Sequence, residues 1–108
     1  MTNYDFIDEF ITDPTRKAVN GHMYCVDGEL VLYSTPICVR RLDGGFTVNS
    51  SKISATTSKI QSYILRALER HGCEYDTVKA GINGYYWNCG YQGAPNWTVR
   101  ELKERGIF

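Results

Sequence analysis

The sequence lacks an excess of charge of either sign. Its 108 residues carry 12 Lys and Arg against 12 Asp and Glu, and the pI is about 6.7. A dedicated nucleic-acid binder usually carries a clear basic excess. Global charge therefore steers this chain neither toward nucleic acid nor away from it, and only local charge clusters indicate a partner.

A long apolar run is missing from the start of the chain. The first 12 residues contain no Lys or Arg, and Asp5, Asp8 and Glu9 interrupt the apolar residues there. A secretory signal needs a basic start and an unbroken apolar stretch, and a membrane span needs about 20 apolar residues. We therefore expect a cytoplasmic protein that does not enter a membrane.

Signatures of reactive sites are also missing. The spacings of Cys25, Cys38, His71, Cys73 and Cys89 match no zinc pattern, and the glycines form neither a dinucleotide fingerprint nor a P-loop. A Cys73 thiol beside His71 would follow the negative end of a helix dipole, which disfavours a reactive thiolate. We therefore expect no catalytic residue, no metal and no cofactor, with the cysteines as reduced, small buried side chains.

The first third of the chain predicts a helix and a hairpin. A helix over residues 3–12 would bury four apolar side chains and end at Asp13-Pro14. These side chains are Phe6, Ile7, Phe10 and Ile11. Polar residues 15–21 are typical of a connection. Strand-like residues 22–26 and 29–33 then flank Asp27-Gly28, which favours a two-residue hairpin.

Residues 37–49 predict a second hairpin with one buried face. Apolar and polar residues alternate with the period of a strand. The apolar residues of this pattern are Ile37, Val39, Phe46 and Val48. With Asp43-Gly44 at the centre of a tight turn, Val39 lies opposite Val48 and Arg41 lies opposite Phe46.

The main helix is predicted over residues 59–71. Ser58 and Gln61 form a capping box at its start, and Gly72 ends it in the left-handed conformation. Its buried side chains would be Ile60, Ile64, Ala67 and Leu68.

Beyond Gly72 we expect a further hairpin around Asn83-Gly84 and a terminal helix that begins at the Thr98 capping box. These elements together predict a single α+β domain, with an antiparallel meander of four or more strands packed on one main helix and short helices at both ends.

Two surfaces are candidate binding sites. The C-terminal third carries closely spaced aromatic residues, which are favoured as anchors at protein interfaces. These are Tyr85, Tyr86, Trp87, Tyr91 and Trp97. Asp5, Asp8 and Glu9 would steer a basic partner toward them.

The second candidate is a basic, hydroxyl-rich surface for nucleic acid or a nucleotide. Helix N-termini favour anions, and hydroxyl and ammonium groups contact phosphate. This surface would comprise Arg40, Arg41, Lys52, Thr56, Thr57, Ser58 and Lys59. The alternative interpretation is that the hydroxyls cap the helix and the lysines are merely solvated.

The run Leu32-Tyr33-Ser34-Thr35-Pro36-Ile37, with Gly45-Phe46-Thr47-Val48-Asn49 and Ser54-Ala55-Thr56-Thr57-Ser58-Lys59 after it, resembles a core of small phage and mobile-element proteins. The resemblance implies an accessory protein that binds and blocks a host protein or ribonucleoprotein complex, as anti-CRISPR and other anti-defence inhibitors do. It carries no catalytic residue. We therefore expect a non-enzymatic inhibitor, with nucleic-acid binding as the alternative. An exposed sheet edge is also compatible with a homodimer.

Overall fold

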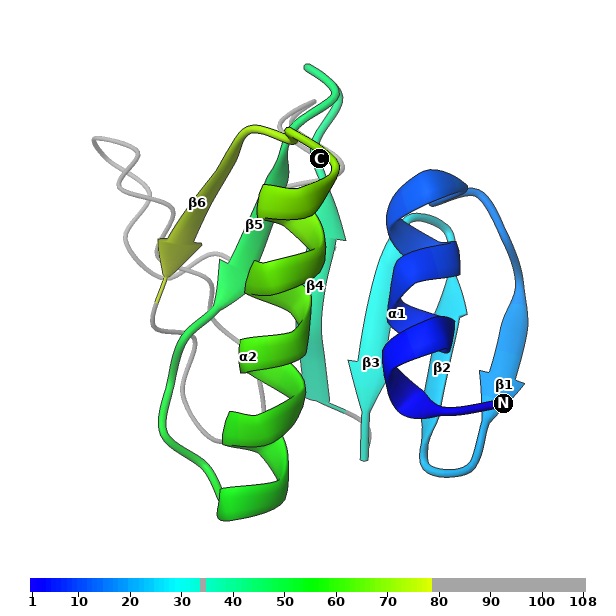
Figure 1. Ribbon diagram of the computed structural model, residues 1–108, viewed down its shortest axis with the longest axis vertical. Helices are drawn as coiled ribbons and strands as arrows, with labels where there is room; N and C mark the ends of the chain where they lie inside the picture. Colours follow the sequence, from blue (N-terminus) through cyan, green and yellow to red (C-terminus); the bar gives the residue numbers. More distant parts are fainter. Residues whose placement is uncertain (34, 79–108) are drawn as a thin grey trace.

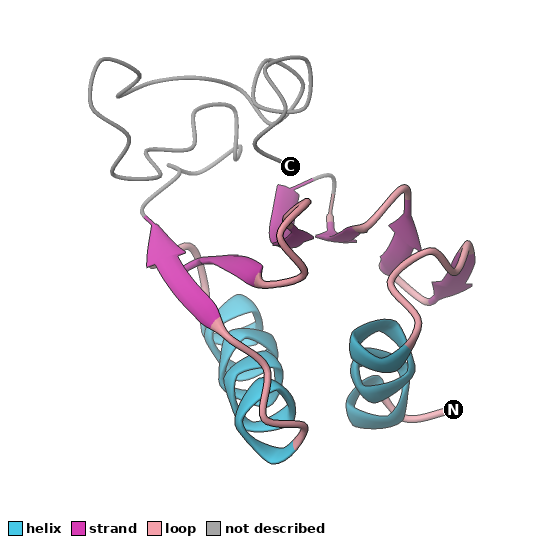
Figure 2. Ribbon diagram, turned by 90° about the horizontal axis from the view of Figure 1, so that it is seen from above, coloured by secondary structure: helices cyan, strands magenta, loops and turns pink. Residues whose placement is uncertain are grey.

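The computed structural model describes residues 1–33 and 35–78. In these residues the elements follow in the order α1 (Asn3–Thr12), β1 (Ala18–Asn20), β2 (Met23–Val26), β3 (Glu29–Leu32), β4 (Thr35–Arg40), β5 (Phe46–Asn49), α2 (Ala55–Arg70) and β6 (Tyr75–Val78). The strands form a six-stranded sheet in sequence order. Both helices lie on one face of the sheet (Figures 1 and 2). The fold is α+β, as the sequence predicts.

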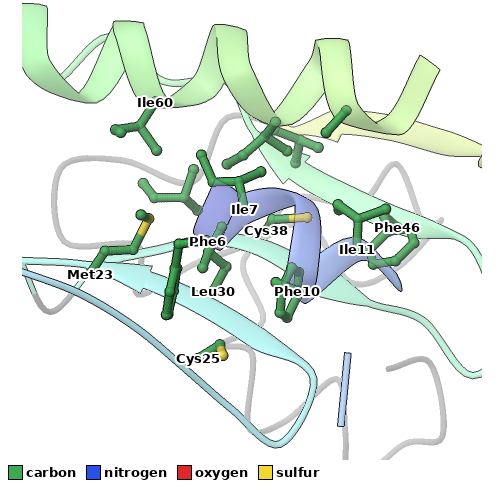
Figure 3. Packing of buried hydrophobic residues seen from close by; sticks show 14 of the residues in the cluster. Phe6, Ile7, Phe10, Ile11, Met23, Cys25, Leu30, Cys38, Phe46 and Ile60 are labelled. Atoms are coloured by element: carbon green, nitrogen blue, oxygen red, sulfur yellow. The ribbon is translucent and has the colours of Figure 1, made fainter. Parts of the chain in front are cut away.

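The core lies between the two helices and the sheet. The four apolar side chains predicted for each helix are buried, which confirms both helical faces. The sheet contributes side chains that include Met23, Cys25, Leu30, Cys38 and Phe46 (Figure 3). The rings of Phe10 and Phe46 meet edge to face, with their centroids 6.1 Å apart. This contact ties α1 to the start of β5, the strand next to β6 in the described sheet.

The start of α2 differs from the prediction. Ser54, not Ser58, caps the helix, and its Oγ accepts a hydrogen bond of 3.1 Å from the backbone N–H of Thr57. Ser54 offers the same capping chemistry one turn earlier, so a further turn of helix forms and Thr57 is buried. The amide of Gln61 instead donates to the carbonyl oxygens of Asn49 and Ser51, at 2.6 and 3.0 Å.

The end of α2 confirms the prediction at Gly72. Its φ is +67°, and the N–H of Cys73 donates to the carbonyl of Leu68 at 2.9 Å. The N–H of Gly72 donates to the carbonyl of Glu69 at 3.1 Å. This pair of hydrogen bonds is the Schellman motif, which needs a left-handed residue at that position.

The register predicted for β4 and β5 was wrong by one residue. Arg40 lies opposite Phe46 and Val39 opposite Thr47. The N–H of Arg41 donates to the carbonyl of Gly45 at 2.8 Å, so the loop between this pair holds three residues, with Gly44 at φ +91°. A type I turn followed by a left-handed glycine is the common three-residue hairpin loop. A β-bulge in the pairing of β3 with β4 also interrupts the alternation of buried and outward side chains along β4. As a result, the neighbouring residues Ile37 and Cys38 both lie in the core beneath the helices. Val39 is therefore buried with Thr47 on the opposite face of the sheet.

The two strands at the edges of this sheet differ from the prediction. β1 forms within residues 15–21, where a connection was predicted, and pairs antiparallel with β2. At the other edge β6 pairs parallel with β5 after the α2 crossover.

The hairpin at Asp27-Gly28 is confirmed, because both residues have positive φ and Val26 lies opposite Glu29.

Three predictions concern the rest of the chain. The hairpin around Asn83-Gly84, the aromatic cluster and the terminal helix from Thr98 lie outside the described residues. Within the described residues, no helix has both the length and the apolar character required to cross a bilayer.

Candidate functional site

Exposed apolar side chains gather around the hairpin formed by β1 and β2. Val19 is 76% exposed, and its cross-strand partner Tyr24 is 38% exposed. Tyr33 follows β3 at the same end of the sheet as the β1–β2 turn and is 58% exposed. We call Val19, His22, Tyr24 and Tyr33 the hairpin surface. Exposed apolar side chains that cluster in this way are typical of an interaction surface.

The alternation of the strands places Val19 and Tyr24 on the face of the sheet away from the helices. Met23 and Cys25, on either side of Tyr24, are buried in the core beneath the helices. Side chains of a strand alternate between its two faces, so Tyr24 and its partner Val19 point the other way.

His22 and Tyr33 form a stacked pair at the end of the hairpin surface. Their ring centroids are 4.5 Å apart with an angle of 21° between the planes, and the N–H of Tyr33 donates to the carbonyl of His22 at 3.1 Å. Tyr33 has a φ of +48°, a conformation that bulky residues rarely adopt. The ring stacks on His22 and more than half of the Tyr33 surface remains exposed, so the pair presents an aromatic surface to solvent.

A depression of about 240 Å³ lies beside this pair. Buried Met23, Leu32 and Ile60 line it with apolar groups, and Asn3, Asn20 and Thr56 add polar groups. This volume is below that of most small-molecule sites, which begin at about 300 Å³. The depression therefore suits one side chain of a partner better than a free ligand.

Two of the three acidic residues predicted to steer a partner are engaged within the chain. Asp8 Oδ1 accepts from His71 Nε2 at 2.7 Å and from the Arg70 guanidinium. Glu9 forms an ion pair with Arg16. Asp5 lies exposed in the first turn of α1. Asp8 and Glu9 therefore hold α1 against Arg70, His71 and Arg16, and their charge is compensated, whereas Asp5 keeps its charge at the surface.

Asp8→Asn should lower the free energy of unfolding by about 0.5–1 kcal/mol at neutral pH, the usual range for partly exposed ion pairs. The His71 hydrogen bond, together with Arg70, lowers the pKa of Asp8 from 3.8. A carboxylate with a lowered pKa stabilises the fold above its unfolded pKa, and this contribution is lost as the pH falls through the folded pKa. Urea titrations at pH 7 and in strong acid should show the difference only at pH 7. Asp5→Asn is the matched control, and an equal loss in both variants would contradict the pairing.

The arginines of the predicted basic surface have different environments. The Arg41 side chain is only 18% exposed and is held by Asp43 at 3.1 Å and by Asp76. Arg40 is exposed and lines an open depression of about 650 Å³ with Pro14 and Leu42. Arg41 is thus a bridge between the β4–β5 turn and β6, and Arg40 alone presents its cation outward.

The remaining residues of that surface lie at the start of α2. Lys52, Thr56, Ser58 and Lys59 are exposed, while Thr57 is buried. Lys59 Nζ lies 5.9 Å from the centre of the Tyr63 ring. The β4–β5 turn and the start of α2 are at opposite ends of β5, which separates them by about 13 Å or more (Figure 1). The basic residues therefore form two separate groups.

The predicted thiol and metal-ligand candidates that the structure describes are Cys25, Cys38, His71 and Cys73. Burial raises the pKa of the thiols of Cys25 and Cys38, so both are uncharged. His71 contacts Asp8, and Cys73 Sγ lies 4.0 Å from the carbonyl oxygen of His71. Among the residues described, no three His, Cys, Asp or Glu side chains gather in a way that could hold a metal ion.

Sequence reasoning missed the hairpin surface. Tyr24 and Tyr33 belong to predicted strands, but nothing in their spacing indicates that they are exposed. Val19 lies in residues predicted to be a connection, and the three residues of β1 are too few for a period-two pattern to be recognised. The one local signal was the turn predicted at Asn20-Gly21, and the observed β1–β2 turn lies one residue later, at Gly21-His22.

Comparison with protein-family models, with curated proteins and with solved structures finds no match to this chain.

Proposed function

We propose that the protein is a non-enzymatic binding protein that docks onto a macromolecular partner and occupies it. The observation that carries this proposal is the hairpin surface, where Val19 on the edge strand β1 is 76% exposed and Tyr33, which follows β3, is 58% exposed. Large apolar side chains that remain exposed at one place mark interaction sites. The aromatic cluster of residues 85–97 remains a predicted second contact.

The nature of the partner is inferred from the resemblance of residues 32–59 to phage and mobile-element proteins. A protein of that origin would act in the cytoplasm of a bacterial host and would block a host protein or ribonucleoprotein complex. An anti-CRISPR or other anti-defence role belongs to this class. A non-enzymatic binding function is consistent with the ion pair between Asp8 and Arg70 and with the burial of the Cys38 thiol.

Nucleic-acid binding is the second candidate, through the exposed group at the start of α2. Lys52, Thr56, Ser58 and Lys59 lie there with the backbone donors of a 16-residue helix. The separation of Arg40 and Arg41 from this group leaves two lysines as its cations. Few phosphate contacts would give weak binding that falls with salt.

Affinity capture from bacterial lysate, with and without nuclease, tests the proposal. The tagged chain should retain the same protein in both conditions, with little dependence on salt. Val19→Glu should abolish this retention, because it places a charge in the apolar contact, whereas Leu42→Glu at the far end of the sheet should not. Retention that disappears with nuclease, or that falls steeply with salt, would favour nucleic-acid binding instead.

A further inference from the structure

We propose that β1 is extended by an acidic, extended segment of the partner protein, which adds to the edge of the sheet as a further strand. The proposal rests on the proposed function and specifies its mode of contact. In the described sheet β1 is the terminal strand and pairs on one side only, with β2. An unpaired strand edge offers backbone donors and acceptors that match any extended backbone.

The register of the β1–β2 hairpin shows which backbone groups are available. Gly21 and His22 form the two-residue turn, with Gly21 at φ +64°, and Asn20 lies opposite Met23. Residues that flank such a turn exchange both hydrogen bonds, and the next pair does not. Val19, opposite Tyr24, therefore directs its N–H and C=O away from β2. If β1 is prolonged by the added strand, the backbone N–H and C=O of Lys17, two residues earlier, also point away from β2.

The charge around β1 selects the partner segment. From residue 14 to residue 26 the sequence contains Arg16, Lys17 and His22 but no Asp or Glu. Asp13 lies just before this range, and its Oδ1 accepts a hydrogen bond of 2.7 Å from the Thr15 hydroxyl. Arg16 is paired with Glu9, so the exposed Lys17 is the cation nearest the open edge. An incoming strand with an apolar residue beside Val19 and a carboxylate beside Lys17 would match this face, since cross-strand neighbours of opposite charge are favourable.

A second copy of this chain matches the edge less well. Self-pairing of β1 would bring two basic segments together, which is unfavourable. β1 is also only three residues long and is preceded by a lysine, two features that limit self-association at sheet edges. These features disfavour pairing of β1 with β1 of a second copy, and an acidic segment from another protein is the better occupant of the edge.

Substitution at Val19 separates the backbone contact from the side-chain contact. Val19→Pro removes the outward N–H and leaves the hydrogen bonds between β1 and β2 in place, because proline is tolerated where the N–H of an edge strand faces solvent. Val19→Thr is the matched control, since it keeps the donor and the β-branched shape. Amide spectra of both variants would establish that the fold is intact.

The probes are three capped synthetic peptides, one of alternating Glu and Val, one with Lys in place of Glu, and one acidic peptide with alternate backbone N-methyl groups. The acidic peptide should shift the amide signals of Lys17 and Val19. The basic and N-methylated peptides should bind at least about tenfold more weakly. Val19→Pro should weaken binding of the acidic peptide by a similar factor, and Val19→Thr should not.

Other results would overturn strand addition. Strand addition would be ruled out if none of the three peptides shifted the amide signals of Lys17 and Val19. It would also be ruled out if Val19→Pro and the wild-type chain bound the acidic peptide equally well. A dimer that Val19→Pro dissociates would assign the edge to a second copy instead. If Val19→Pro retains the captured partner while Tyr33→Ala loses it, strand addition fails and the proposed function stands. If neither variant changes capture, strand addition and docking at the hairpin surface both fail.

Discussion

Phe10→Ala should lower the free energy of unfolding by about 3–5 kcal/mol, the usual cost of removing a buried phenylalanine. Phe10 has no exposed surface and meets Phe46 of β5 edge to face. Its removal would leave a cavity between α1 and the sheet that neither element can close, since α1 is also held by Ile7 and by the contact of Asp8 with α2. Urea titration followed by circular dichroism measures the change.

Val19→Ala provides the control for Phe10→Ala. Val19 is 76% exposed, so its truncation should change stability by less than about 0.5 kcal/mol. A loss below about 1 kcal/mol for Phe10→Ala would contradict the packing of α1 against the sheet.

Tyr24→Ala combined with Tyr33→Ala should weaken binding of the captured partner by at least about 100-fold. Exposed tyrosines at a docking surface act as hot spots, each contributing about 2 kcal/mol when it becomes fully covered. Neither ring belongs to the core cluster, so the fold should remain intact. Calorimetric titration of the purified partner measures the affinity, and urea titration measures the stability of the variant.

Leu42→Ala is the matched control for this pair. Leu42 is 71% exposed but lies in the β4–β5 turn, at the other end of the sheet from the β1–β2 turn. A parallel variant in which Tyr86 and Trp87 become Ala tests the predicted aromatic contact. If only that variant weakens binding, the partner uses the C-terminal third and the hairpin surface is not an anchor.

Local chemistry predicted the elements that depend on it. The apolar spacing of residues 3–12 and the face of α2 follow from the helical period, and Gly72 and Asp27-Gly28 follow from the need for positive φ. The start of α2 was placed one turn late because Ser54 and Ser58 offer equivalent caps. The extra turn that buries Thr57 requires knowledge of what lies beneath it.

Elements that depend on distant contacts could not be predicted in the same way. β1 exists because β2 pairs with it, and β6 because α2 carries the chain back to β5. The register of β4 and β5 was shifted by the loop that ends at Gly44. The bulge at Ile37 and Cys38 lies in the pairing of β3 with β4, and it changes which face a residue of β4 occupies.

The environments of the charged candidate residues also depend on contacts between residues that are distant in the sequence. The sequence marks Asp8, Glu9 and Arg41 as available charges, but tertiary contacts pair each of them with a residue of opposite charge. The corresponding partners, Arg70 and Asp76, lie more than 30 positions away from Asp8 and Arg41 in the sequence. Val19, Tyr24 and Tyr33 of the hairpin surface carry no charge and therefore gave no signal of this kind.

Hydrogen exchange of the chain, alone and saturated with its captured partner, shows whether the partner docks at the hairpin surface. Docking at the hairpin surface should slow exchange in residues 16–26 and at Tyr33, with the outward amide of Val19 among the groups protected. Unchanged exchange in those residues, with new protection at the β4–β5 turn or at the start of α2, would contradict the account.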